Sequence, residues 1–412
     1  MAAIIKMDNR TITRIINQII SISDCNTEFL DDFNGTSKSF GLGETNISFN
    51  GIETVSIYQK NLEKLYQSNK EIAATISLKT FEENFIKLLR QWKNDSISPN
   101  IDHFKELINA LLKLETKESE IFYDLYGLEM ESPTHNLGQF KIYNFNKTEE
   151  KLYKDYPHLL KKKLFFDNRN SDFFISIKVS ARENRKAVEI GDNYIKSFEN
   201  VMNFMIADLK NERNIGSFNH REWRSYNRIL LTEKSVGFSG NRKLTFPENI
   251  EDPYFIDSSQ GNDKIWFLIT KKDKNEIEKR ILQSIEWIGK GVYDNDLSKS
   301  LVQFVFAVEA MLKYDEKSAI SPSIVSQLSE WLAFIIEVDF EKRKEIAKYF
   351  KDVYRKRSSI VHGGENNVDL KDVQLALKTS KRLIYSLMVK KPFNSFKNMK
   401  ELSEYINELK FQ

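Results

Sequence analysis

The residues around position 360 carry side chains suited to proton transfer and phosphate binding. From Arg357 the chain reads Arg-Ser-Ser-Ile-Val-His-Gly-Gly, so four residues separate the arginine from His362, and two glycines follow. Imidazole titrates near neutrality and can act as a general acid or base. Guanidinium stays charged and binds phosphate oxygens through paired hydrogen bonds. His362 is the only histidine in the last third of the chain.

The direction of Arg357 follows from the helix that must carry it. Apolar spacing predicts a helix over 340–362, and the glycines after His362 can supply the left-handed residue that ends it. Arg357 falls on the apolar stripe of this helix, in register with Phe350 and Val353. An arginine directed toward a core is costly unless it is paired.

Glu309 offers a partner for Arg357. It belongs to a helix expected over 298–313, where Val305 and Leu312 mark the inner face. Glu309 lies four residues after Val305, so it points inward or to the margin. The pair can be a structural ion pair that sets the helix register, or part of a working site. Spacing alone leaves both readings open.

The whole chain is expected to be an α+β protein in three parts. Residues 1–130 are predicted to be mostly helical, with a loop from Asp31 to Asn50 where Gly, Ser, Asn and Thr are frequent. Residues 131–271 are predicted to be a mixed α+β sensor or recognition domain. Its expected strands are 139–145, 172–179, 228–232 and 264–269.

Residues 272–412 are predicted to form an all-helical bundle. The expected helices are 274–289, 298–313, 322–337, 340–362, 369–390 and 395–410. Asp339 and Asp369 are expected to cap the fourth and fifth of these helices.

Composition limits the function classes. The formal net charge of +3 comes from 62 basic and 59 acidic side chains, so a nucleic-acid partner would need a local basic patch. One cysteine, Cys25, excludes an internal disulfide and favours a reducing compartment. The chain shows no signal peptide and no apolar run that is long enough to span a membrane. We expect a cytoplasmic protein with no cofactor and no metal site.

The segment from about 275 to 390 resembles the HEPN superfamily of helical ribonucleases, in particular its ApeA-like branch. Three stretches carry the resemblance: Ile285-Glu286-Trp287-Ile288-Gly289, Phe304 to Leu312, and Arg357 to Gly364. The last fits the family signature of an arginine, four to six residues and a histidine. The resemblance does not extend to residues 1–270.

The resemblance implies metal-independent RNA cleavage that leaves a 2′,3′-cyclic phosphate and a 5′-hydroxyl. His362 would be the general acid or base and Arg357 the phosphate clamp. Glu309 would orient the arginine, and Ser358 occupies a position where relatives often have a polar residue.

The basic neighbours of Arg357 need separate roles. Arg355 also fits the loose signature, but it lacks the inward register of Arg357. Arg355 and Lys356 are therefore expected to contact the RNA backbone.

Helix geometry leaves two routes to a complete site, unwinding of the helix end at Gly363 or dimerisation, and the resemblance favours the homodimer. Residues five apart diverge by about 140° around a helix, so one copy does not bring Arg357 and His362 onto one phosphate. A two-fold axis could combine two copies of the motif into a composite active site. Gly364 stands where some HEPN toxins have a modifiable tyrosine, which disfavours that mode of control.

The ApeA-like resemblance implies a bacterial antiphage effector of abortive infection. Its substrate would be RNA, with tRNA among the candidates, and a phage-derived trigger or regulatory partner would act through residues 1–270. Two alternatives remain. One is a non-catalytic HEPN-type scaffold that senses a phage or nucleic-acid partner. The other is a metal-dependent nuclease in the α+β part.

Overall fold

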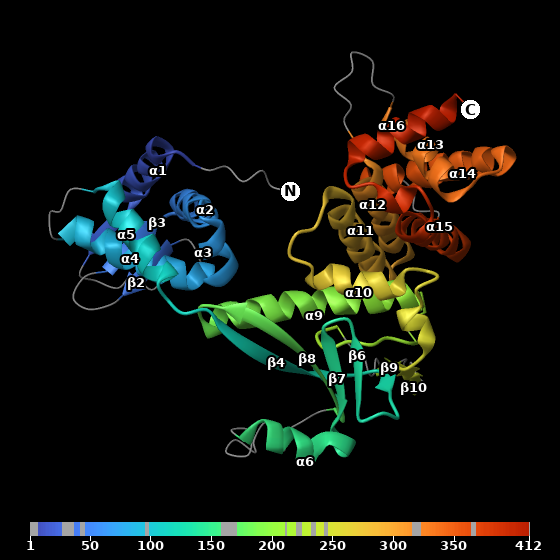
Figure 1. Ribbon diagram of the computed structural model, residues 1–412, viewed down its shortest axis with the longest axis horizontal. Coiled ribbons are helices and arrows are strands. Elements are labelled where there is room, and N and C mark those ends of the chain that lie inside the picture. The colour runs from blue at the N-terminus through green and yellow to red at the C-terminus, as the bar shows by residue number, and fades with distance from the viewer. Residues whose placement is uncertain are drawn as a thin grey trace. The chain divides into compact units, whose positions relative to one another are not determined.

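The computed structural model consists of helices and small sheets, which confirms the predicted α+β class with a helical C-terminal part (Figure 1). The structure describes residues 7–26, 37–41, 46–94, 99–157, 171–210, 212–219, 225–231, 236–242, 246–314, 323–363 and 368–411. None of the helices in these ranges is long and apolar enough to cross a membrane. The chain forms two compact units, Met1–Ile121 with Lys178–Asp192, and Phe122–Ile177 with Asn193–Gln412.

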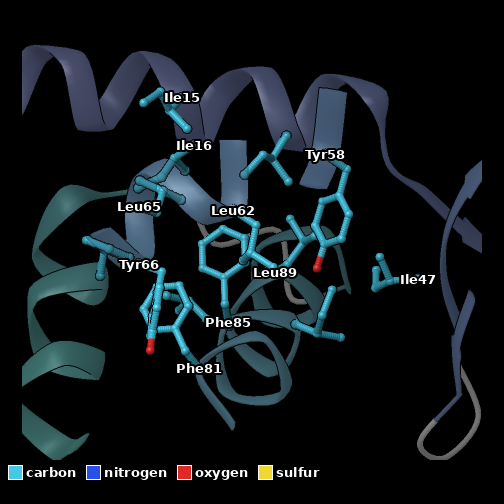
Figure 2. Packing of buried hydrophobic residues seen from close by; sticks show 14 of the residues in the cluster. Ile15, Ile16, Ile47, Tyr58, Leu62, Leu65, Tyr66, Phe81, Phe85 and Leu89 are labelled. Carbon is cyan, nitrogen blue, oxygen red and sulfur yellow. The ribbon is translucent and has the colours of Figure 1, made fainter. Parts of the chain in front are cut away.

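The first unit packs helices and a small antiparallel sheet around an aromatic core. Its elements are α1 (Asn9–Ile22), β1 (Asp24–Asn26), β2 (Ser37–Gly41), β3 (Asn46–Asn50), α2 (Ile52–Gln67), α3 (Lys70–Thr75), α4 (Leu78–Asn94) and α5 (Ile101–Leu112). The sheet order is β1-β3-β2. Tyr66, Phe81 and Phe85 lie close together in the core (Figure 2).

The predicted loop from Asp31 to Asn50 is wrong where β2 and β3 lie. Ile47 and Phe49 are fully buried, and the Phe49 ring stacks on Tyr58 of α2 with ring centres 3.9 Å apart. The polar composition of the segment concealed these strands. β3 pairs with β1 on one side and with β2 on the other. The apolar side chains of β2 and β3 join a core that is built mainly from helices.

The second unit contains the α+β region. Its elements include β5 (Leu128–Glu129), β6 (Thr134–Leu137), β7 (Phe140–Asn144), α6 (Phe145–Asp155), β9 (Ser225–Leu231), β10 (Val236–Arg242), β11 (Glu248–Asn249) and η1 (Pro253–Ile256). Three elements contribute residues to both units, namely β4 (Lys117–Leu125), β8 (Phe173–Ala181) and α9 (Asn184–Ile206). The main sheet has the order β4-β8-β7-β6. The strands predicted at 139–145, 172–179 and 228–232 are confirmed as β7, β8 and β9.

The strand predicted at 264–269 is wrong, because this segment is a helix, α10 (Asn262–Thr270). Lys264 and Phe267 are exposed and three residues apart, while the residues between and after them are buried. Trp266 packs against Phe140 and Phe198, with ring centres 6.3 and 5.5 Å away. A short apolar run is compatible with both the strand period and the helix period. Here the packing of the buried residues against other elements favours the helix.

The C-terminal part is the predicted helical bundle. Its helices are α11 (Glu276–Tyr293), α12 (Leu297–Leu312), α13 (Ile324–Ile336), α14 (Phe340–Val361), α15 (Leu370–Val389) and α16 (Met399–Lys410). Asp339 and Asp369 cap α14 and α15 as expected. Helix α12 packs against its neighbours α11, α13, α14 and α15 (Figure 1). It therefore presents a side chain to almost every part of the bundle.

One glycine explains how α11 lies against α9. A Cβ atom at Gly289 would come within 2.4 Å of the Asn200 carbonyl oxygen and 2.7 Å of its Cα. These are backbone atoms of α9, so any side chain here would force the two helices apart. The glycine of the Ile285 to Gly289 stretch thus has a packing role, and it joins the bundle to the α+β region within the second unit.

Candidate active site

Arg357 and Glu309 meet as their helical spacing predicts. The Nη2 atom of Arg357 on α14 lies 3.5 Å from Oε2 of Glu309 on α12. The side chains are 18% and 19% exposed, so both charges are largely removed from water. At this distance the contact is an ion pair rather than a short hydrogen bond. The structure confirms the pairing, and the catalytic role of either residue stays a prediction.

Two aromatic rings hold the Arg357 guanidinium. Its central carbon lies 4.9 Å from the ring centre of Phe306 and 5.5 Å from that of Tyr354. Trp287 of α11 supports Phe306, with ring centres 5.1 Å apart. Cation–π contacts of this kind contribute about 0.5–2 kcal/mol each. The rings restrict the orientation of the guanidinium.

The Nε atom of Arg357 adds a feature that spacing could not show. This atom is buried and has no hydrogen-bond partner among the described residues. A buried donor without an acceptor is costly, by about 1–3 kcal/mol. The guanidinium therefore keeps one donor that no described residue accepts.

Tyr354 is a residue of this site that the sequence reasoning missed. Burial raises the pKa of its hydroxyl, and the hydrogen bond to Glu309 and the charge of Glu309 raise it further. Glu309 therefore faces both Tyr354 and Arg357. The signal was available, because Tyr354 precedes Arg357 by three residues and Phe306 precedes Glu309 by three, which puts each pair on one helix face.

His362 is the C-cap residue of α14 and is exposed. Its backbone N–H donates to the Ser358 carbonyl at 3.1 Å, and Gly363 follows with φ +80°. Among the described residues the imidazole forms no ion pair and no hydrogen bond. Gly363 thus supplies the expected left-handed residue, while Gly364 lies outside the described residues. The histidine is free to meet a ligand or another chain.

The structure does not bring His362 into contact with Arg357. Five residues of helix correspond to roughly 7.5 Å along the axis and to about 140° around it. Ser358 is partly buried beside Arg357 in sequence, and its backbone carbonyl serves the end of the helix. A single copy therefore presents the arginine and the histidine at separate places.

Arg355 and Lys356 differ in how they are held. Arg355 is 77% exposed, and its Nη1 lies 2.8 Å from Asp352 on the same helix. Lys356 pairs with Asp372 in the first turn of α15, where Asp372 also completes a capping box. Arg355 is thus open to a polyanion, whereas Lys356 links the end of α14 to the start of α15.

Comparisons with protein-family models, with curated proteins and with solved structures found no match. The resemblance to HEPN ribonucleases therefore depends on the quoted motifs alone. Within the described ranges, no group of three or more His, Cys, Asp or Glu side chains could hold a metal ion.

Proposed function

We propose that the protein is a metal-independent HEPN-type endoribonuclease. The observation that carries the proposal is the Arg357 guanidinium, which lies against Glu309 and Phe306 and whose buried Nε has no hydrogen-bond partner in the described part of the chain. His362 lies exposed at the end of the same helix. This combination supplies a fixed phosphate-binding cation and a titratable group, the two components that RNA cleavage by the 2′-hydroxyl needs.

In the proposed reaction, His362 removes the proton of a ribose 2′-hydroxyl. The O2′ atom attacks the adjacent phosphorus, and Arg357 stabilises the negative charge that grows on the phosphoryl oxygens. The bond between phosphorus and O5′ breaks, O5′ takes up a proton from solvent water, and His362 returns its proton to the solvent. The products are a 2′,3′-cyclic phosphate and a 5′-hydroxyl. Glu309 positions Arg357, and Arg355 contacts the RNA backbone.

The composite site belongs to the same proposal. The separation of Arg357 and His362 on α14 supports a homodimer in which one copy contributes the arginine and its partner the histidine. The exposed ends of two α14 helices would then face each other across the two-fold axis. Val361 is 49% exposed beside His362, so this end of the helix also offers apolar surface to a second copy.

A non-catalytic scaffold is the second candidate. The observation that favours it is that protein side chains already surround the guanidinium. Glu309, Phe306 and Tyr354 together could hold Arg357 for stability alone. Such a domain would bind a phage or nucleic-acid partner without cleaving it. The two candidates differ in one measurable respect. A nuclease cleaves RNA, and His362→Ala abolishes that cleavage while stability stays unchanged. A scaffold does not cleave RNA in either form.

RNA end analysis tests the proposed reaction. The full-length protein is incubated with total tRNA in EDTA, and the 3′ ends are mapped before and after acid opening of cyclic phosphates. We expect cyclic ends from the wild type and a loss of cleavage of at least about 100-fold in His362→Ala. Lys348→Ala is the matched control, because Lys348 is exposed on α14 nine residues before Arg357 and so lies on the opposite side. Cleavage by His362→Ala at the parental rate contradicts the proposal.

The biological role proposed is antiphage defence by abortive infection in the cytoplasm. Residues 1–270 would recognise a phage-derived trigger and control the C-terminal domain. The test compares phage plating and cell growth in bacteria expressing the wild type or His362→Ala. Protection by wild type that disappears in His362→Ala supports the role, and equal protection by both excludes a role for the nuclease in it.

A further inference from the structure

A cavity unrelated to the Arg357 site lies in the second unit. Its volume is about 480 Å³, within the range of sites for small molecules. One wall comes from residues 207–210, which follow α9 directly. The other comes from one face of α15 between Leu370 and Tyr385.

The cavity is strongly basic. Lys210, Lys378, Lys381 and Arg382 line it, and Asp208 is its single carboxylate. This local excess of positive charge contrasts with the near balance of the whole chain. A cavity whose walls have one sign of charge concentrates ligands of the opposite sign.

Asp208 is already engaged by backbone groups. Its Oδ1 accepts from the N–H of Lys210 at 3.0 Å, and its Oδ2 accepts from the N–H groups of Glu212 and Arg213 at 2.7 and 2.9 Å. The carboxylate thus shapes the loop after α9. Its three backbone contacts explain its presence in this loop.

Lys381 is the most buried cation of the cavity wall. Its Nζ donates to the Met205 carbonyl at 3.0 Å and lies 5.3 Å from the ring centre of Phe204. Burial lowers the pKa of its amine to about 8. Capping the end of α9 accounts for one of its three donor hydrogens. Lys381 forms no ion pair within the described part of the chain, so an anion in the cavity would offset the cost of burying it.

The cavity also has apolar lining residues. These are Leu209, Leu370, Leu377 and Tyr385. The Tyr385 hydroxyl lies 3.2 Å from that of Tyr254, which fixes the ring, and the Nζ atom of Lys381 lies 5.9 Å from the ring centre. The cavity thus brings cationic side chains and an aromatic ring close together.

We propose that this cavity binds a nucleoside phosphate. The phosphate groups would lie against Lys378 and Lys381, and the base would lie against Tyr385 and the leucines. Arg382 contributes less, since its Nη2 already lies 3.1 Å from the Ile336 carbonyl and 3.3 Å from Glu337. The cavity is open to solvent, and its volume of about 480 Å³ suits a small ligand. This site is independent of the proposed ribonuclease activity.

Calorimetric titration of the full-length protein tests the site. The probes are ATP, GTP, adenosine and tripolyphosphate, each without added metal. We expect ATP or GTP to bind at least about tenfold more tightly than either adenosine or tripolyphosphate, a difference of about 1.4 kcal/mol. Lys378→Gln and Lys381→Gln should each raise the Kd by at least about tenfold. The control is Lys79→Gln, an exposed lysine of the first unit, which should bind like the wild type.

Several results would overturn the proposal. They are no binding of either nucleotide, equal affinity in both lysine variants, tripolyphosphate binding as tightly as ATP, or binding of a 12-residue RNA without binding of the nucleotides. Unfolding curves check that each variant folds. If Lys381→Gln does not fold, Gln374→Trp replaces it, because Gln374 is exposed and lines the cavity, so an indole there should block the nucleotide.

Discussion

Arg357 and Glu309 form an ion pair in which each side chain is less than one-fifth exposed, with Nη2 and Oε2 3.5 Å apart. Glu309 also raises the pKa of the Tyr354 hydroxyl, so one carboxylate acts on two side chains of α14. The contact joins α12 to α14 at the point where the proposed chemistry needs a fixed cation. Its strength can be measured separately from any activity.

A double-mutant cycle measures this pair. Glu309→Gln and Arg357→Ala should each lower the free energy of unfolding by about 1–3 kcal/mol, because each leaves one largely buried charge without its partner. The double variant should lose less than the sum of the two, by at least about 0.5 kcal/mol. Urea unfolding of the four proteins provides the values. Strict additivity would mean that the two charges do not stabilise each other.

Tyr354→Phe tests the interaction of the Tyr354 hydroxyl with Glu309. The variant should be less stable by roughly 1 kcal/mol at neutral pH, since a polar interaction with a charged group is lost. The pKa of Tyr354 is raised in the folded protein, so its stabilising contribution is complete below the unfolded value near 10 and declines above it. Unfolding measured at rising pH should therefore bring the two proteins together above pH 10. In a Glu309→Gln background, the stability lost through Tyr354→Phe should become smaller.

The sequence predicted the parts of this site that follow helical period. Arg357 faces inward because it shares the stripe of Phe350 and Val353, which are buried. Tyr354 and Phe306 follow the same geometry, but an aromatic residue on a helix is read first as core. The contacts that α14 makes with α12 decide which aromatic rings meet a cation, and a single sequence does not contain that information.

The two errors in the predicted secondary structure have a common cause. The segment 264–269 is too short for period to separate strand from helix, and Phe140 and Phe198 give its buried face a place to pack. The strands β2 and β3 have loop-like composition; β3 pairs with β1 and β2, and Ile47 and Phe49 join a core that includes Phe81 and Phe85. In both cases the core contacts come from residues far away in the sequence.

Lys381→Met tests the cost of burying the amine that lines the basic cavity. The pKa of Lys381 is lowered to about 8 in the folded protein, below the value of about 10.4 expected in the unfolded chain. Between these two pH values the unfolded chain binds more protons, so the free energy of unfolding of the wild type rises with pH. The variant lacks this gain. The difference in unfolding free energy between variant and wild type should therefore change by roughly 2–3 kcal/mol in favour of the wild type from pH 7 to pH 10. The matched control is Lys378→Met, because Lys378 is an exposed neighbour on α15.

Mixing two inactive variants tests whether the proposed active site takes residues from both copies. Arg357→Ala and His362→Ala are each expected to be inactive. If the arginine and the histidine of one site come from different chains, half of the dimers formed after mixing and refolding are hybrids, and each hybrid holds one intact site. Cleavage should then recover to about one-quarter of the wild-type rate. If both residues act from one chain, the mixture should remain inactive although hybrids form, which size analysis of differently tagged chains would verify.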